Sequence, residues 1–186
     1  VTGIPYWDVT KSQQVGEPLY YNSLMSSGSD SHGLYKKQRL VPFGEYIPLS
    51  GMLKWVLPAM QNDVSMSGFS RGEANQKPLI VKGHALAAAI CYEVAYPNLT
   101  RRNASNSDFL ITVSNDAWFT GTAGPWQHLQ MVQMRAKENG RWFIRATNTG
   151  VTAFIDHNGH IVKQAPLDEA FVLRGDLPAM QGQTLY

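Results

Sequence analysis

Cys91 is the one cysteine of the 186-residue chain, and its place in the sequence suits a nucleophile. It follows the small apolar run 85–90, which is typical of a strand buried on both faces. A side chain at the carboxyl end of such a strand stands at the sheet edge, where the next backbone N–H can face a developing oxyanion. The same pattern also suits a buried structural thiol, so the residue type leaves both interpretations open.

Lys37 and Glu45 are the charged residues that could assist a thiolate. Lys37 lies in a strand-like stretch that leads into the proline-punctuated loop carrying Glu45. A lysine beside the sulfur can stabilise both the thiolate and a tetrahedral oxyanion, and a carboxylate can hold that lysine by a charge-assisted hydrogen bond. The alternative is that Lys36 and Lys37 are surface lysines and Glu45 is a solvated loop acid.

The histidines give weaker signals. His128 would complete a Cys–His protease pair, but it lies on an expected helix beside Trp126, where a packing or capping role is more usual. His157 and His160 flank an Asn-Gly turn without two further metal ligands nearby. We therefore expect no metal site and no cofactor.

Composition bounds the class of protein. Hydrophobic residues make up 44% and charged residues 16%, which excludes disorder, and 186 residues suit one domain without an internal linker. A net charge of +2 without a basic cluster gives no reason to expect a nucleic-acid partner. One cysteine excludes an internal disulfide, and no apolar run reaches the length of a membrane span.

Apolar patterning predicts an α/β domain that can present these residues at strand ends. The clearest helix is 125–139, with Pro125 at its start, Gly140 at its end and a stripe of Trp126, Leu129, Val132 and Ala136. A shorter helix is expected over 51–57, and 26–33 is expected as a loop or hairpin tip. Strands are expected at 19–24, 34–41, 79–82, 85–90, 108–114, 142–147, 151–156, 160–164 and 170–176.

Several motifs in this order resemble the carbon–nitrogen hydrolase (nitrilase) superfamily, and within it the bacterial apolipoprotein N-acyltransferases. The most specific are Leu-Val-Pro-Phe-Gly-Glu, which ends at Glu45, and Cys-Tyr-Glu, which begins at Cys91. The full set occupies 35–46, 69–72, 89–93, 114–119, 124–128 and 145–152.

The resemblance implies a nitrilase-like α-β-β-α sandwich, incomplete at its N-terminal side. Residues 1–186 would be the C-terminal two-thirds of the catalytic domain. The family's general-base glutamate lies in a Pro-Glu motif that this sequence lacks upstream of Lys37. We therefore expect the isolated chain to be inactive, because nothing in it would deprotonate Cys91.

The resemblance also implies residue roles. Cys91 would take an acyl chain from a membrane phospholipid as a thioester and pass it to the N-terminal amine of a diacylglyceryl-cysteine lipoprotein. Lys37 would stabilise the oxyanions and Glu45 would position Lys37, while Tyr92 and Glu93 match residues needed beside the nucleophile. Trp118 and Phe119 could contact acyl chains, as could Met52, Leu53, Trp55 and Val56, although such apolar residues more often belong to a core.

The same resemblance places the domain on the periplasmic face of the bacterial inner membrane, held there by segments that this sequence does not include. Two alternatives remain. One is a soluble amidase of the superfamily that uses water as the acceptor and hydrolyses a C–N bond. The other is a non-catalytic fragment that has lost the base.

Overall fold

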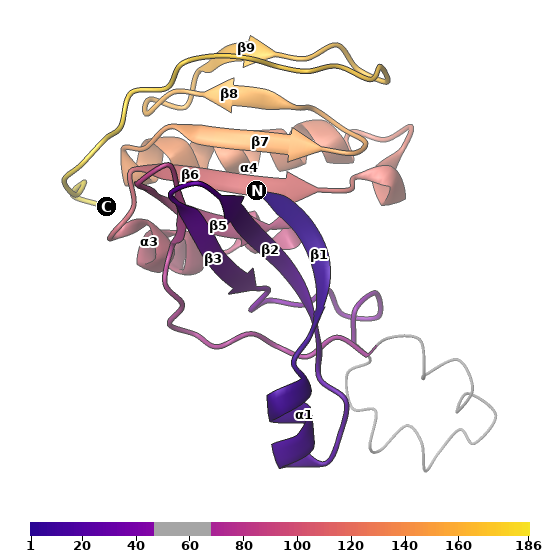
Figure 1. The fold of residues 1–186 in the computed structure, drawn as a ribbon. Helices are drawn as coiled ribbons and strands as arrows, with labels where there is room; N and C mark the ends of the chain where they lie inside the picture. Colours follow the sequence, from indigo (N-terminus) through magenta and orange to yellow (C-terminus); the bar gives the residue numbers. More distant parts are fainter. Residues whose placement is uncertain (47–67) are drawn as a thin grey trace.

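The computed structural model describes residues 1–46 and 68–186, whose strands form one mixed sheet (Figure 1). Neighbours in the sheet are also neighbours in the chain. The parallel pairs β5–β6 and β6–β7 lie at its centre, and the remaining pairs are antiparallel. The strands are β1 (Thr2–Trp7), β2 (Tyr20–Gly28), β3 (Ser31–Lys36), β4 (Leu79–Val81), β5 (His84–Ile90), β6 (Phe109–Ser114), β7 (Phe143–Thr147), β8 (Ala153–Ile155) and β9 (Ile161–Gln164).

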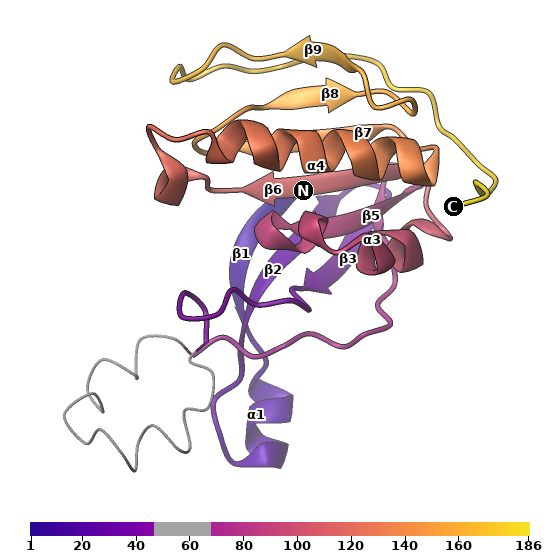
Figure 2. The same cartoon turned by 180° about the vertical axis from the view of Figure 1, so that it is seen from behind.

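Two helices cover one face of the parallel strands. They are α3 (Pro97–Ala104) and α4 (Gly124–Asn139), and both lie in front of the sheet in Figure 2. The smaller helices are α1 (Val9–Val15) and the single 3-10 turns η3 (Cys91–Ala95) and η4 (Ala117–Phe119). No helix in residues 1–46 or 68–186 has the length and apolarity needed to cross a bilayer.

Strand β5 is buried on both faces, as its run of small apolar residues predicts. Successive strand residues point to opposite faces, so Ala87 and Ala89 pack toward the helices with Leu129 and Val132. The alternate positions belong to a second cluster that also draws on the antiparallel strands. Its members are Leu24, Tyr35, Leu79, Leu86, Ala88, Ile90, Phe109 and Ile111.

Strand direction brings the chemically interesting segments to one edge of the sheet. β3 is antiparallel to β4, and β4 is antiparallel to β5, so β3 runs in the same direction as β5 and its parallel neighbours. The carboxyl ends of β3, β5, β6 and β7 therefore lie along the same edge. Lys37 follows β3 and Cys91 follows β5, which places both residues there.

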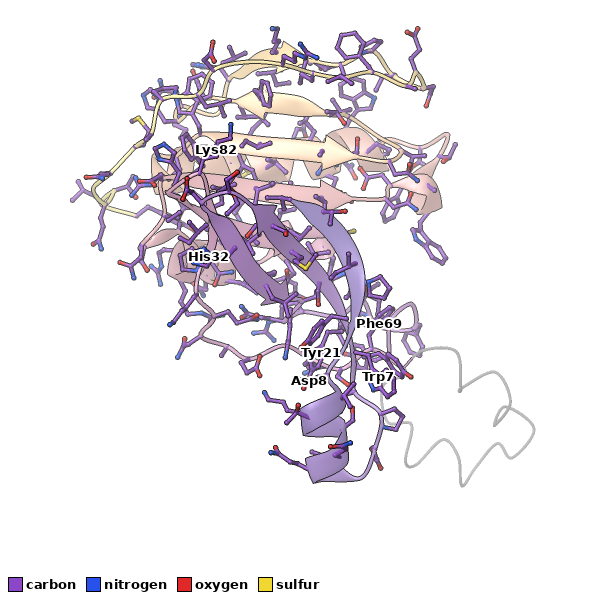
Figure 3. All side chains as sticks on the ribbon, in the orientation of Figure 1. Trp7, Asp8, Tyr21, His32, Phe69 and Lys82 are labelled. Carbon is purple, nitrogen blue, oxygen red and sulfur yellow. The ribbon has the colours of Figure 1, made fainter. Side chains whose placement is uncertain are left out.

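Lys36 fixes the other side of β3. Its ammonium is buried, lies 2.8 Å from Asp8 Oδ2 and sits 4.4 Å from the ring centre of Tyr21. Asp8 also caps α1 by accepting a hydrogen bond from the backbone N–H of Lys11. Asp8, Tyr21, Trp7 and Phe69 gather at the end of β1 and β2 nearest α1, while His32 and Lys82 lie at the opposite end (Figure 3).

Much of the expected secondary structure is confirmed. The α/β class holds, and β4, β5, β6 and α4 match the strands expected at 79–82, 85–90 and 108–114 and the helix expected at 125–139. Gly140 ends α4 with φ +59°, a left-handed conformation that glycine adopts readily. The hairpin tip expected at 26–33 is shorter than predicted, because β2 continues to Gly28 and β3 begins at Ser31.

Other expectations were wrong, and each has a local reason. The strand expected at 34–41 ends at Lys36. The N–H of Lys37 still donates to the carbonyl of Asn22 in β2, but the N–H groups of Gln38 and Arg39 donate to a side chain instead of to a strand. Residues 170–176 form no strand, and the carbonyl of Arg174 there accepts from the Lys163 side chain.

Two further differences concern helices. Neither α1 nor α3 was expected from the sequence. Trp126 is 46% exposed, so it does not belong to the buried stripe of α4, which His128, Arg135 and Asn139 share instead. The helix expected over 51–57, with Met52, Leu53, Trp55 and Val56, lies outside the described residues.

Gly72 allows its segment to run close beside Lys37. Its N–H donates to the carbonyl of Lys37 at 2.8 Å, and a Cβ at this position would collide with the backbone carbonyl of Lys36. Backbone atoms cannot move aside as a flexible side chain can. Gly72 therefore sets how closely this segment packs against the end of β3.

We expect Gly72→Ala to lower the free energy of unfolding of the protein by about 1–3 kcal/mol, the usual cost of overpacking. Gly3→Ala is the matched control, since a Cβ at Gly3 meets no atom within 4 Å, and it should change stability by less than about 0.5 kcal/mol. Chemical denaturation of both variants checks this. Equal stability of the two variants would contradict the packing argument.

Candidate active site

Cys91 sits in a strained turn at the carboxyl end of β5. Its φ is +50°, a left-handed conformation that costs a non-glycine residue about 1–2 kcal/mol. The residue is half-buried, and its carbonyl lies 3.0 Å from Nε2 of His128. Strain of this kind persists only where surrounding contacts impose it, and it is frequent at functional sites.

Glu93 is the contact that joins this turn to the end of β3. Its carboxylate is fully buried and accepts four hydrogen bonds. Oε1 accepts from the N–H groups of Gln38 at 2.6 Å and Arg39 at 3.0 Å, and Oε2 accepts from the N–H of Ile90 at 2.8 Å and the hydroxyl of Tyr35 at 3.0 Å. One side chain thus links the residues directly after Lys37 to the residue directly before Cys91.

The surroundings of Glu93 act on its pKa in opposite directions. Burial raises the pKa of Glu93, the hydrogen bonds from Ile90, Arg39, Gln38 and Tyr35 oppose that shift, and the net shift is upward. All four partners are donors, so the ionised carboxylate has its acceptor sites satisfied. Burial also raises the pKa of Tyr35 well above its usual value, and the nearby charge of Glu93 adds to that shift.

Lys37 and Glu45 form a buried, two-pronged ion pair. Lys37 is 1% exposed, and its Nζ lies 2.8 Å from each carboxylate oxygen of Glu45. Asn22 Nδ2 donates to Glu45 Oε1, and the Val41 N–H donates to Oε2, both at 2.8 Å. The structure therefore contradicts the alternative that Lys37 is a surface lysine and Glu45 a solvated acid.

A second buried network lies on the helical side of Cys91. Asp116 Oδ1 lies 2.9 Å from Nδ1 of His128 and accepts from Ser114 Oγ at 2.5 Å, while Oδ2 accepts from Arg145 Nη2 at 2.6 Å. Burial raises the pKa of Asp116, but the hydrogen bonds from His128 and Ser114 and the charges of Arg145 and His128 outweigh it, so the net shift is downward.

Arg145 places a buried cation beside Asp116. Burial lowers the pKa of its guanidinium, whereas the negative charges of Asp116 and of ionised Cys91 oppose that shift. Its Nη1 is buried without a hydrogen-bond partner among the described residues. The sequence argument missed Arg145, Asp116 and Tyr35 as site residues, although all three lie inside the quoted motifs.

The remaining expected site residues lie at the surface. Tyr92 is 38% exposed and contacts the ring of Tyr96 edge to face. Trp118 and Phe119, on η4 after β6, are 85% and 47% exposed, so the alternative that they belong to the core is wrong for both. His160 is exposed and pairs with Asp156 in the hairpin turn.

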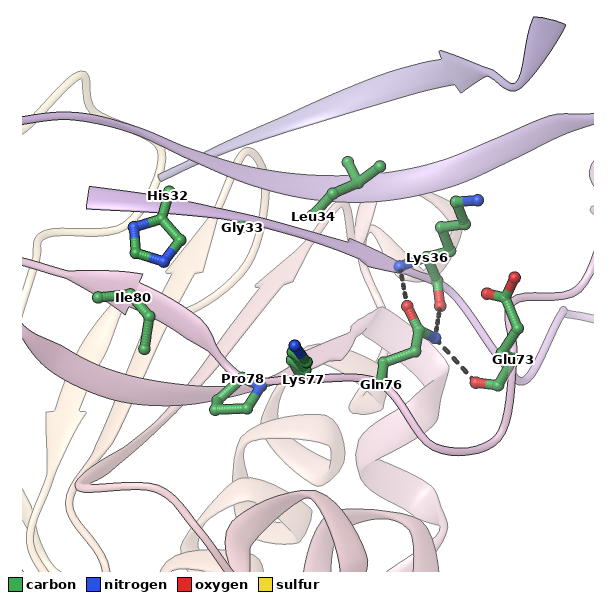
Figure 4. Close-up of a pocket in the computed structure, with 9 residues that line it drawn as sticks. All are labelled: His32, Gly33, Leu34, Lys36, Glu73, Gln76, Lys77, Pro78 and Ile80. Carbon is green, nitrogen blue, oxygen red and sulfur yellow. Dashed lines mark hydrogen bonds between the residues drawn. The ribbon is translucent and has the colours of Figure 1, made fainter. Parts of the chain in front are cut away.

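A hollow of about 450 Å³ lies between β3 and residues 73–80, away from Cys91 (Figure 4). The side-chain amide of Gln76 bonds both the N–H and the carbonyl of Lys36 at 2.7 Å, which continues the strand-like pairing of β3. The residues that line the hollow include His32, Leu34, Lys36, Glu73, Lys77 and Ile80. No cluster of three or more potential metal ligands occurs in the part of the chain that the structure describes.

Comparison with known proteins gives consistent results. The sequence model of the Carbon-nitrogen hydrolase family matches residues 1–184. Proteins named apolipoprotein N-acyltransferase from Azotobacter vinelandii and Pseudomonas paraeruginosa are each 48% identical over all 186 residues. The chain spans about a third of the length of these relatives, 35% in both cases.

A solved structure gives the fold independently. The crystal structure of a carbon-nitrogen hydrolase from Helicobacter pylori superimposes with a TM-score of 0.61 at 19% sequence identity, covering 87% of this chain and 56% of that protein. The expected nitrilase-like fold is therefore confirmed.

We expect Glu93→Gln to lower the free energy of unfolding by more than about 2 kcal/mol, because each stranded buried donor costs about 1–3 kcal/mol. A glutamine amide offers one acceptor oxygen, and its NH₂ would face donors. Glu73→Gln is the matched control, since Glu73 pairs with Lys11 at the surface, where ion pairs contribute about 0–1 kcal/mol. Denaturant titration of the protein compares the two, and similar losses would refute the assigned role of Glu93.

Proposed function

The chain belongs to the carbon–nitrogen hydrolase family, and from that premise we propose that it is part of an acyltransferase in which Cys91 is the nucleophile. The observation that carries the proposal is the set of hydrogen bonds at Glu93, which ties the turn of Cys91 to the residues that follow Lys37. The name shared by the relatives at 48% identity supports acyl transfer to a lipoprotein. Residues 1–186 would then be the C-terminal two-thirds of a single catalytic domain.

In the first proposed step, the Cys91 thiolate attacks the carbonyl carbon of a phospholipid ester. The tetrahedral intermediate collapses as the ester C–O bond breaks, which leaves an acyl thioester on Cys91 and releases a lysophospholipid. The leaving oxygen takes up a proton. A thioester retains the acyl group in reactive form while one lipid leaves and another enters.

In the second step, the α-amine of a diacylglyceryl-cysteine lipoprotein attacks the thioester carbonyl. The C–S bond breaks, an amide forms, and Cys91 recovers its thiol as the amine loses a proton. The base for both proton transfers would be the family's Pro-Glu glutamate. We assign it to residues of the protein beyond this sequence, as the short coverage of the relatives allows.

Lys37 would stabilise the oxyanion that forms in both steps. Its ammonium is buried, so its charge acts with little screening by water, and Glu45 fixes its direction through two contacts. Tyr92 borders the nucleophile and is open to solvent, which suits contact with an incoming group.

Trp118 and Phe119 would contact the acyl chains of the donor or the bilayer surface. Both are exposed on the turn after β6, at the same sheet edge as Cys91. The proposed location is the periplasmic face of the bacterial inner membrane, with membrane attachment through other segments of the protein.

The test uses the full-length protein that contains this chain, incubated with phospholipid micelles and analysed by intact mass spectrometry. We expect a mass increase of one acyl chain on Cys91, which Cys91→Ala abolishes. Lys37→Met should slow adduct formation by about 100-fold or more, as loss of an oxyanion donor does. Lys36→Met is the matched control, because Lys36 is also buried and ion-paired but pairs with Asp8 instead.

Lys36→Met should keep the adduct even if it lowers thermal stability. An adduct that persists in Cys91→Ala would refute the nucleophile. A thioester that water resolves, and that a diacylglyceryl-cysteine peptide does not, would favour the amidase over the acyltransferase.

A further inference from the structure

His128 contacts the backbone of Cys91 from helix α4. Its ring is 8% exposed, and Nε2 lies 3.0 Å from the carbonyl oxygen of Cys91. Nδ1 lies 2.9 Å from Oδ1 of Asp116. The ring thus spans the space between the turn of the nucleophile and a buried carboxylate at the end of the next strand, β6.

The contact with the Cys91 carbonyl determines that one ring nitrogen, Nε2, carries a proton. A backbone carbonyl only accepts hydrogen bonds, so Nε2 must carry a proton. Nδ1 faces Asp116, whose carboxylate also accepts from Ser114 and Arg145, and it lies 3.4 Å from Nη2 of Arg145. His128 therefore donates from Nε2 to Cys91, while Asp116 orients the ring through Nδ1.

The same contacts bear on the strain at Cys91. A left-handed residue needs partners that hold its backbone, and Glu93 fixes the N–H of Ile90 on one side of the turn. His128 holds the carbonyl of Cys91 on the other side. Gly150, with φ +106°, leaves no room for a Cβ beside Asp116, so the carboxylate that orients His128 is itself closely packed.

We propose that His128 is a positioning residue for the nucleophile: its ring, oriented by Asp116, donates from Nε2 to the Cys91 carbonyl and keeps Cys91 in its left-handed conformation. This inference rests on the proposed function, since it takes Cys91 as the reacting group. The sulfur itself has no bond to His128, so the role differs from that of a Cys–His protease base.

A pair of substitutions separates the two ends of the ring. In a glutamine, the side-chain nitrogen stands near the place of Nε2, so His128→Gln retains a donor to Cys91 and loses the link to Asp116. In an asparagine, the nitrogen stands near the place of Nδ1, so His128→Asn retains the link to Asp116 and loses the donor to Cys91. Both variants are uncharged amides, so they differ in which ring-nitrogen position keeps a donor.

The measurement is the single-turnover rate of Cys91 acylation in the full-length protein, with the phospholipid concentration varied. We expect His128→Asn to reduce the maximal rate by about 10- to 100-fold, as a misplaced reacting group does, with little change in the concentration that gives half the rate. His128→Gln should recover most of this loss. Asn139→Ala is the matched control, since Asn139 is equally buried on α4 and donates to Arg135.

Alkylation of Cys91 by iodoacetamide, which needs the thiol but no lipid, should follow the same order, because a change in the backbone conformation of Cys91 displaces the thiol. Equal rates for His128→Gln and His128→Asn would overturn the inference. The inference would also be overturned if the losses in rate followed the losses in thermal stability and matched those of Asn139→Ala. If Cys91→Ala abolishes the adduct while both His128 variants react like wild type, this inference fails alone; an adduct in Cys91→Ala refutes the proposed function instead.

Discussion

The carboxylate of Glu93 is the interaction on which the rest of the site depends. It receives two N–H groups from the segment after β3, one N–H from the end of β5, and the hydroxyl of Tyr35. A buried charge without such partners would cost several kcal/mol, and removing the carboxylate would leave its donors unsatisfied. The four hydrogen bonds therefore hold two strand ends in one relative position.

The turn of Cys91 is held from two sides by buried polar side chains. Glu93 binds it toward the antiparallel strands, and His128 binds it toward α4, with Asp116 and Arg145 behind. Glu93 and Asp116 each accept several hydrogen bonds, and buried polar networks with such partners rigidify a structure. The strained φ of Cys91 persists because both networks meet at this residue.

Two adjacent lysines have different roles because they pair with different carboxylates. Lys36 and Lys37 are both buried, yet Lys36 pairs with Asp8 at the start of α1 and Lys37 pairs with Glu45 in the loop beyond β3. Successive positions on an extended chain point in opposite directions, so one lysine anchors β3 and the other is free to face the sheet edge. An isolated Lys-Lys pair gives no sign of this division.

The sequence by itself determined the α/β class, the central strands, helix α4 and the candidate set of Cys91, Lys37 and Glu45. These follow from local patterns: apolar runs, a helix bounded by proline and glycine, and motifs with characteristic spacing. Only the tertiary structure decided that Glu93 bridges two strand ends, that His128 contacts Cys91, and that Trp118 is exposed. Those facts depend on contacts between residues far apart in the chain, such as the 55 positions between Gln38 and Glu93, and no local pattern encodes them. The predicted end of β3 was wrong for the same reason, because the distant side chain of Glu93 takes up N–H groups that would otherwise extend the strand.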